Sequence, residues 1–203
     1  MEPGNAYQKN THRKYKTYNM KKKDEVPVIE PKDILVGNAD APFTLIEFVD
    51  YESEKSEKAH ATVKKVMENF KGKINYNFRH FPMVRIHQRA HKAAEAAIAA
   101  AQEGKFFEMH EMLLKNRRHL GTISLHSYAK ELGIKNKSYL NDLINGKYGW
   151  NVQDDMRFAL ELGIKDVPAF FINGEKLEGH VTEKSLTDFI NHATRKRKVK
   201  HAA

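Results

Sequence analysis

A chain of 203 residues that contains no cysteine excludes disulfide bonds, thiolate catalysis and cysteine-ligated metals. Its hydrophobic content of 40% is enough for one folded α/β core of ordinary size. The formal net charge of +9 could suggest nucleic-acid binding, but its location argues against it. Residues 1–23 hold seven Lys or Arg and one Glu, residues 195–200 hold five Lys or Arg, and the remainder is slightly acidic.

The two ends of the chain are the basic part. We predict a flexible N-terminal segment over 1–32 and a basic C-terminal tail over 195–203, whose partners are at most weakly bound polyanions. Neither end carries the apolar region of a signal peptide, and no stretch is long enough to span a membrane. The sequence as it stands therefore predicts a cytoplasmic protein with no membrane partner; an exported protein whose signal has been removed is the open alternative.

The first predicted elements are two strands, a helix and a third strand. A short strand precedes a turn at 37–42, and an apolar strand follows at 44–49. From Ser53 the apolar residues recur at helical spacing, and this helix is predicted to end near Gly72. Residues 73–82, "KINYNFRHFP", alternate apolar and polar side chains, which predicts a half-buried strand.

The second half is mainly helical until it returns to strands. Five helical segments are predicted within 84–163, at 90–104, 105–116, 124–133, 138–149 and 150–163. "PAFFING" and "EKLEG" then predict a β-hairpin that turns at Asn173-Gly174. A last helix is predicted to begin at a Thr182 cap.

This order of elements, and five short motifs in it, resemble the DsbA-like branch of the thioredoxin superfamily over roughly 34–190. The motifs are "GNADAP", "FVDYE", "FRHFP", "AHKAAEAA" with "GKFFEMHEMLL", and "LGIKDVPAFFING". The resemblance implies an α/β, thioredoxin-like fold: a central mixed β-sheet flanked by helices. It implies one such domain over 33–194, with an inserted helical subdomain at about 84–163.

The resemblance also identifies the place where this chain departs from the family. Members of the DsbA-like family that this chain resembles carry Cys-x-x-Cys at the start of the first long helix, where the helix dipole stabilises a thiolate. Here those positions are Ser53 and Ser56, with Glu54 and Lys55 between them. A serine hydroxyl forms no disulfide and does not ionise near neutral pH, so we do not expect thiol–disulfide exchange and predict no catalytic residue.

Three roles are open for the two serines. Ser53 is placed to cap the helix, where acidic residues in the first turn also suit the positive helix end. Alternatively, Ser53 orients the sulfur of bound glutathione, as the related kappa-class transferases and isomerases imply. A third role, acyl nucleophile, needs a base, and His60 lies about 10 Å further along the helix.

The resemblance further implies a cis Val167–Pro168 bond facing the active-site helix, in a groove that binds extended peptide. Our leading hypothesis is a redox-inactive protein that binds a peptide or partner protein without a cofactor, at a surface made of Ser53, Glu54, Lys55, Ser56, Val167 and Pro168. A glutathione-dependent transferase or isomerase using Ser53 is the alternative from another class. A purely structural role is the third.

Four histidines raise a metal hypothesis that we set aside. His87 and His91 have i, i+4 spacing on a predicted helix, and His80 and His110 are candidates to lie nearby. No cysteine and no obvious acid complete the set, so the sequence predicts no metal site.

Overall fold

A five-stranded sheet forms the centre of this computed structural model, which describes residues 29–38 and 40–200, with side chains up to 195. The strand order is β1-β3-β2-β4-β5. The β2–β3 pair is parallel and the other neighbours are antiparallel, so the sheet is mixed, as predicted. The strands are β1 (Leu35–Gly37), β2 (Thr44–Val49), β3 (Asn75–His80), β4 (Ala169–Ile172) and β5 (Glu175–Lys176).

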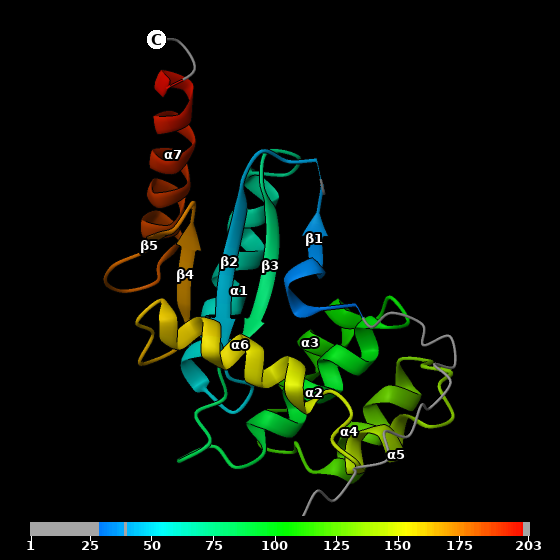
Figure 1. Ribbon diagram of the computed structural model, residues 1–203. Coiled ribbons are helices and arrows are strands. Elements are labelled where there is room, and N and C mark those ends of the chain that lie inside the picture. The colour runs from blue at the N-terminus through cyan, green and yellow to red at the C-terminus, as the bar shows by residue number, and fades with distance from the viewer. Residues whose placement is uncertain (1–28, 39, 201–203) are drawn as a thin grey trace, which may run out of the picture.

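Helices cover both faces of this sheet (Figure 1). On one face, α1 (Glu54–Asn69) and α7 (Glu183–Lys200) bury apolar side chains such as Val63 and Ile190 against Leu45 of β2. On the other face, α6 (Gly149–Glu161) packs Phe158 against Phe48. This is the layered arrangement of a thioredoxin-like fold, with one core on each face.

The predicted strand within 73–82 is confirmed as β3, but the prediction that it is half-buried is wrong. In β3 the polar residues Asn75 and Asn77 are as buried as Tyr76 and Phe78. The reason is that β3 lies between β1 and β2, and a short 3₁₀ helix at Pro31–Asp33 covers its second face. Asn77 Nδ2 donates hydrogen bonds to the carbonyl oxygens of Pro31 and Ile34, at 2.9 and 2.8 Å, so its amide is buried but satisfied.

The helical insertion is confirmed between β3 and β4. Besides α6 it contains α2 (Ala90–Ala101), α3 (Phe106–Lys115), α4 (Thr122–Glu131) and α5 (Tyr139–Ile144). The alanine run of α2 is the buried centre, where small side chains let neighbouring helices approach closely. Tyr139 of α5 donates a hydrogen bond to the carbonyl of Ala96 at 2.8 Å, which ties the insertion together.

The predicted hairpin turn and the predicted helix cap near the C-terminus are both confirmed. β4 and β5 form a hairpin in which Asn173 and Gly174 have φ of 53° and 79°, as a two-residue loop of this type requires. Thr182 Oγ1 accepts a hydrogen bond from Ser185 N at 3.0 Å and so caps α7.

The chain ends differ from the prediction where the structure describes them. Ile29 N donates to Gln102 Oε1 at 2.9 Å and Asn151 Nδ2 donates to Glu30 Oε2 at 2.8 Å, so residues 29–32 belong to the fold rather than to a flexible segment. At the other end α7 continues to Lys200, into the predicted tail 195–203. Residues 1–28 and 201–203 lie outside the description. Within 29–38 and 40–200, no helix has the length and apolarity to cross a membrane.

Candidate functional site: the groove at the start of α1

The serine pair at the start of α1 is held by backbone hydrogen bonds. Ser53 has extended backbone angles, and its Oγ accepts from Ser56 N at 3.3 Å, so the predicted N-cap is confirmed. Ser56 is fully buried, and its Oγ accepts from Asp50 N at 3.4 Å. Both hydroxyl oxygens therefore stabilise the helix start and the turn before it.

A groove opens beside this helix start, with a cavity volume of about 700 Å³. Three of the predicted residues line it: Ser53, Glu54 and Lys55. Its other walls come from the loop after β3 and the loop before β4. The remaining lining residues are Lys58, Met83, Ile86, His87, Lys165 and Asp166.

One ion pair bridges the groove. Lys55 Nζ lies 2.6 Å from Asp166 Oδ2, and this hydrogen bond lowers the pKa of the Asp166 carboxyl. Glu54 pairs with Lys58 one turn further on, at 2.7 Å, which lowers the pKa of Glu54. Because these side chains are mostly exposed, both pairs contribute little stability and remain available to a bound partner.

The other three predicted residues do not line this groove. Ser56 and Val167 are buried beneath it. The Val167–Pro168 bond is cis, the isomer that the resemblance implies, and Pro168 lines a separate cavity of about 260 Å³ on the far side of the same loop. Only Asp166 and Lys165 line both cavities.

Asp50 holds the loop that forms the apolar wall of the groove. Its Oδ2 accepts from Met83 N at 2.7 Å and from His87 Nδ1 at 2.8 Å, while its Oδ1 accepts from Glu52 N at 2.8 Å. The carboxylate therefore ties the turn before α1 to residues 83–87, and Ile86, 65% exposed, projects beside Ser53 in the groove.

Glu52 connects the same turn to the helical insertion. Its Oε2 accepts from Arg89 N at 2.7 Å and from Ala90 N at 2.9 Å, the amides of the N-cap residue and of the first residue of α2. A carboxylate at a helix N-terminus satisfies free N–H groups and complements the helix dipole. Asp50 and Glu52 thus place the loop and α2 against the start of α1.

The four histidines of the metal hypothesis are not brought together. His87 precedes α2, which begins at Ala90, so the predicted helical spacing with His91 is wrong. His91 lies 3.2 Å from Glu95, and His80 lies 2.8 Å from Asp155. Among the described residues, no group of three or more ligand side chains is arranged to hold a metal ion.

His60 and His110 form a buried chain with Tyr51. Tyr51 Oη lies 3.0 Å from His110 Nδ1, and His110 Nε2 lies 3.3 Å from His60 Nδ1. Burial lowers the pKa of both histidines, and the neighbouring ring lowers that of His110 further. The Ser53 hydroxyl oxygen accepts a hydrogen bond from Ser56 N in its own helix, so this geometry gives no support to Ser53 as an acyl nucleophile activated by His60.

The sequence analysis missed six of the nine residues that line the groove, and it also missed Asp50, which holds the loop of the apolar wall. The six are Lys58, Met83, Ile86, His87, Lys165 and Asp166. Asp50 and Asp166 lie inside the quoted motifs "FVDYE" and "LGIKDVPAFFING", close to residues that were predicted to form the site. Met83 and Ile86 had no signal of their own, because their position depends on a contact with a residue more than thirty positions away.

Comparison with known proteins agrees with this geometry. A family profile described as thioredoxin matches residues 30–192. Solved structures with the same fold include a thioredoxin-like oxidoreductase from Silicibacter pomeroyi, 23% identical with a TM-score of 0.71 over 80% of this chain and 92% of that one. Oxidised BdbD from Bacillus subtilis is 20% identical with a TM-score of 0.73, over 82% of this chain and 93% of that one.

The curated relatives are much longer proteins. A Na⁺/H⁺ antiporter NhaA from Salinispora tropica is 30% identical over 168 residues, which are 83% of this chain but 26% of the antiporter. This chain therefore spans about a quarter of that relative. Because the profile covers residues 30–192, the chain belongs to the thioredoxin family, and its fold is that of the DsbA-like oxidoreductases.

Proposed function

We propose that this protein binds an extended peptide segment of a partner protein in the groove beside α1, without thiol–disulfide exchange. The observation that carries the proposal is the composition of the groove: an apolar wall at Met83 and Ile86 faces charged side chains, and serines hold the two positions where the family resemblance places cysteines. Apolar contacts with a few polar groups that fix orientation are typical of a recognition site.

The absence of thiol chemistry follows from the side chains at the helix start. Thiol–disulfide exchange needs an attacking thiolate and a leaving sulfur. This chain has no cysteine, and the hydroxyls of Ser53 and Ser56 accept hydrogen bonds from backbone amides. We therefore assign the serines to holding the groove in shape.

The curated relatives are compatible with a role in recognition. In the Salinispora protein, a domain similar to this chain makes up about a quarter of a protein named for Na⁺/H⁺ exchange. That named activity requires no thiol chemistry. A domain that binds a protein segment is compatible with such a setting.

A matched pair of variants tests the groove. Cysteine-free extended peptides, taken from a random decapeptide library, are titrated into the ¹⁵N-labelled protein. We expect amide shifts at 53–58, 83–87 and 165–168, and binding at least tenfold weaker in Ile86→Asp, because a charge then replaces an apolar contact. Ile123→Asp is the control, since Ile123 is 77% exposed and lies on α4, away from the groove.

Peptide shifts that avoid these three segments, or equal weakening by both variants, would contradict the proposal. The same titration with reduced glutathione tests the transferase alternative. If glutathione binds, and binding weakens in Ser53→Ala while the library peptides have no effect, the groove is a glutathione site and the peptide proposal is wrong.

A further inference from the structure

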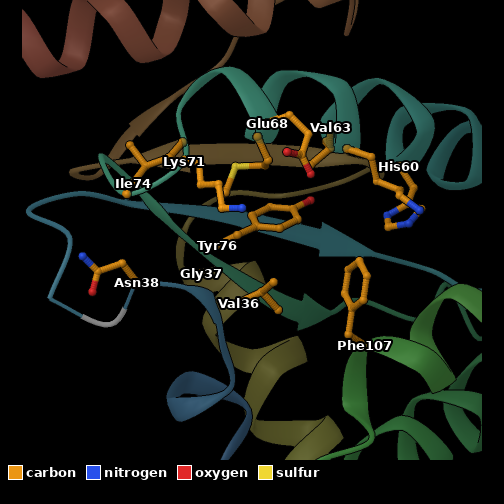
Figure 2. Close-up of a pocket in the computed structure, with 13 residues that line it drawn as sticks. Val36, Gly37, Asn38, His60, Val63, Glu68, Lys71, Ile74, Tyr76 and Phe107 are labelled. Atoms are coloured by element: carbon orange, nitrogen blue, oxygen red, sulfur yellow. The ribbon is translucent and has the colours of Figure 1, made fainter.

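A second cavity lies on the same side of the sheet as α1, between α1, β1, β3 and α3, with a volume of about 640 Å³ (Figure 2). It shares no lining residue with the groove beside Ser53. We propose that this pocket binds a small apolar molecule that carries a carbonyl or carboxylate oxygen. The proposal is independent of the function proposed for the groove.

The walls of the pocket are mainly apolar. α1 contributes Val63 and Met67, β1 contributes Val36 and α3 contributes Phe107, while Ile74 directly precedes β3. Figure 2 shows Val36 and Phe107 on the opposite side of the cavity from Val63 and the rest of α1. A volume of this size and an apolar lining are typical of sites that enclose small organic ligands.

Two buried polar atoms at this pocket have no hydrogen-bond partner: Tyr76 Oη and His60 Nε2. Tyr76 is 2% exposed and His60 is 8% exposed, and both side chains line the cavity. The nearest carboxylate oxygen to His60 Nε2, Glu111 Oε1, is 3.6 Å away, which is too far for a hydrogen bond. Each unsatisfied atom costs free energy that a ligand oxygen would recover.

The hydrogen-bond chain behind His60 decides which kind of ligand atom fits. If the Tyr51 hydroxyl donates to His110 Nδ1, then His110 Nε2–H donates to His60 Nδ1, and His60 Nε2 carries a proton. If every hydrogen bond of this chain ran the other way, the buried Tyr51 hydroxyl proton would have no acceptor among these groups. That arrangement costs more free energy than the first one. His60 Nε2–H is therefore a donor, and the Tyr76 hydroxyl can donate beside it, so an acceptor oxygen on the ligand can satisfy both groups.

Charges of both signs lie at the rim of the pocket. Lys64 is paired with Glu111 and its Nζ lies 6.0 Å from the centre of the Phe107 ring, while Glu68 and Lys71 line the pocket further along α1 and just after it. Because neither sign dominates, the rim does not select between a neutral carbonyl and a carboxylate. The two head groups are separate arms of the test.

The test uses three probes with the same ten-carbon chain: decanoate, methyl decanoate and decylammonium. Calorimetric titration of the full chain should show saturable 1:1 binding of decanoate, methyl decanoate or both, and at least tenfold weaker binding of decylammonium, which has no acceptor. Tyr76→Phe should weaken binding about five- to tenfold, the effect of one hydrogen bond. Tyr128→Phe, outside the pocket, should leave it unchanged.

Met67→Trp provides a second variant, because the larger side chain fills the cavity and should abolish binding. Circular dichroism establishes that each variant is folded before it is titrated. The proposal is wrong if neither acceptor probe saturates the protein. It is also wrong if decylammonium binds as tightly as they do, or if Tyr76→Phe and Met67→Trp bind like the unaltered chain.

Discussion

Glu47 on β2 is the least satisfied acidic residue of the described core. It is fully buried, and both carboxylate oxygens lack a hydrogen-bond partner. By strand alternation it lies on the α1 face of the sheet with Leu45 and Val49, among apolar neighbours. Burial therefore raises the pKa of Glu47 well above 4.5, and the carboxyl is protonated in the folded protein over a wider pH range than in the unfolded chain.

This gives a prediction about stability and pH. Below about pH 4.5 both states hold the Glu47 proton, whereas above it the unfolded chain ionises first, so the free energy of unfolding falls as pH rises. Glu47→Gln cannot ionise, and it should be more stable than the unaltered chain at pH 7, with a difference that shrinks toward pH 4. Urea unfolding of both proteins between pH 4 and pH 7 measures this difference in the free energy of unfolding. A difference that does not change with pH would show that the pKa of Glu47 is not raised in the folded protein.

Individual site residues could be predicted only where a sequence motif marked them. Ser53, Glu54 and Lys55 occupy the motif positions and do line the groove. Asp50 and His87 could not be paired in advance, because their contact depends on how the loop after β3 folds back. The i, i+4 spacing of His87 and His91 was misleading because His87 lies in that loop, three residues before α2 begins at Ala90.

At the scale of elements, the start of α1 depends on one side chain. Ser53→Ala removes the acceptor for Ser56 N and should lower the free energy of unfolding by about 1 kcal/mol, which corresponds to a Tm lower by about 2–4 °C. Ser53→Asp is the matched control, since aspartate is an equally good N-cap. Thermal unfolding that leaves the alanine variant unchanged, or that destabilises both variants equally, would show that the cap contributes little.

Helices and turns were predictable because their signals are local. Helical spacing, the caps at Ser53 and Thr182, and Asn173-Gly174 each act within a few residues. The burial of β3 was not local. The alternation in 73–82 indicated that one face of the strand is exposed to solvent. In the fold, β3 pairs with both β1 and β2, and the 3₁₀ helix Pro31–Asp33 covers its second face, so Asn75 and Asn77 are buried too. Strand position in the sheet is a property of the whole fold.

At the scale of the whole molecule, two candidate binding regions lie at different positions along α1. The groove lies at the N-terminal end of this helix, and the apolar pocket lies along its middle and C-terminal end. The buried chain of Tyr51, His110 and His60 runs from the turn before α1 to the pocket wall. The fold resembles that of an oxidoreductase, while the side chains at its helix start are those of a cap.

The central claim is that the fold is kept and the thiol chemistry is lost. Reduction of insulin by dithiothreitol tests it most directly, with this chain beside the double variant Ser53→Cys, Ser56→Cys. We predict a rate equal to buffer for the unaltered chain and a clearly faster rate for the double variant, because the helix start and its dipole would then stabilise a thiolate. A rate above buffer for the cysteine-free chain would contradict the account.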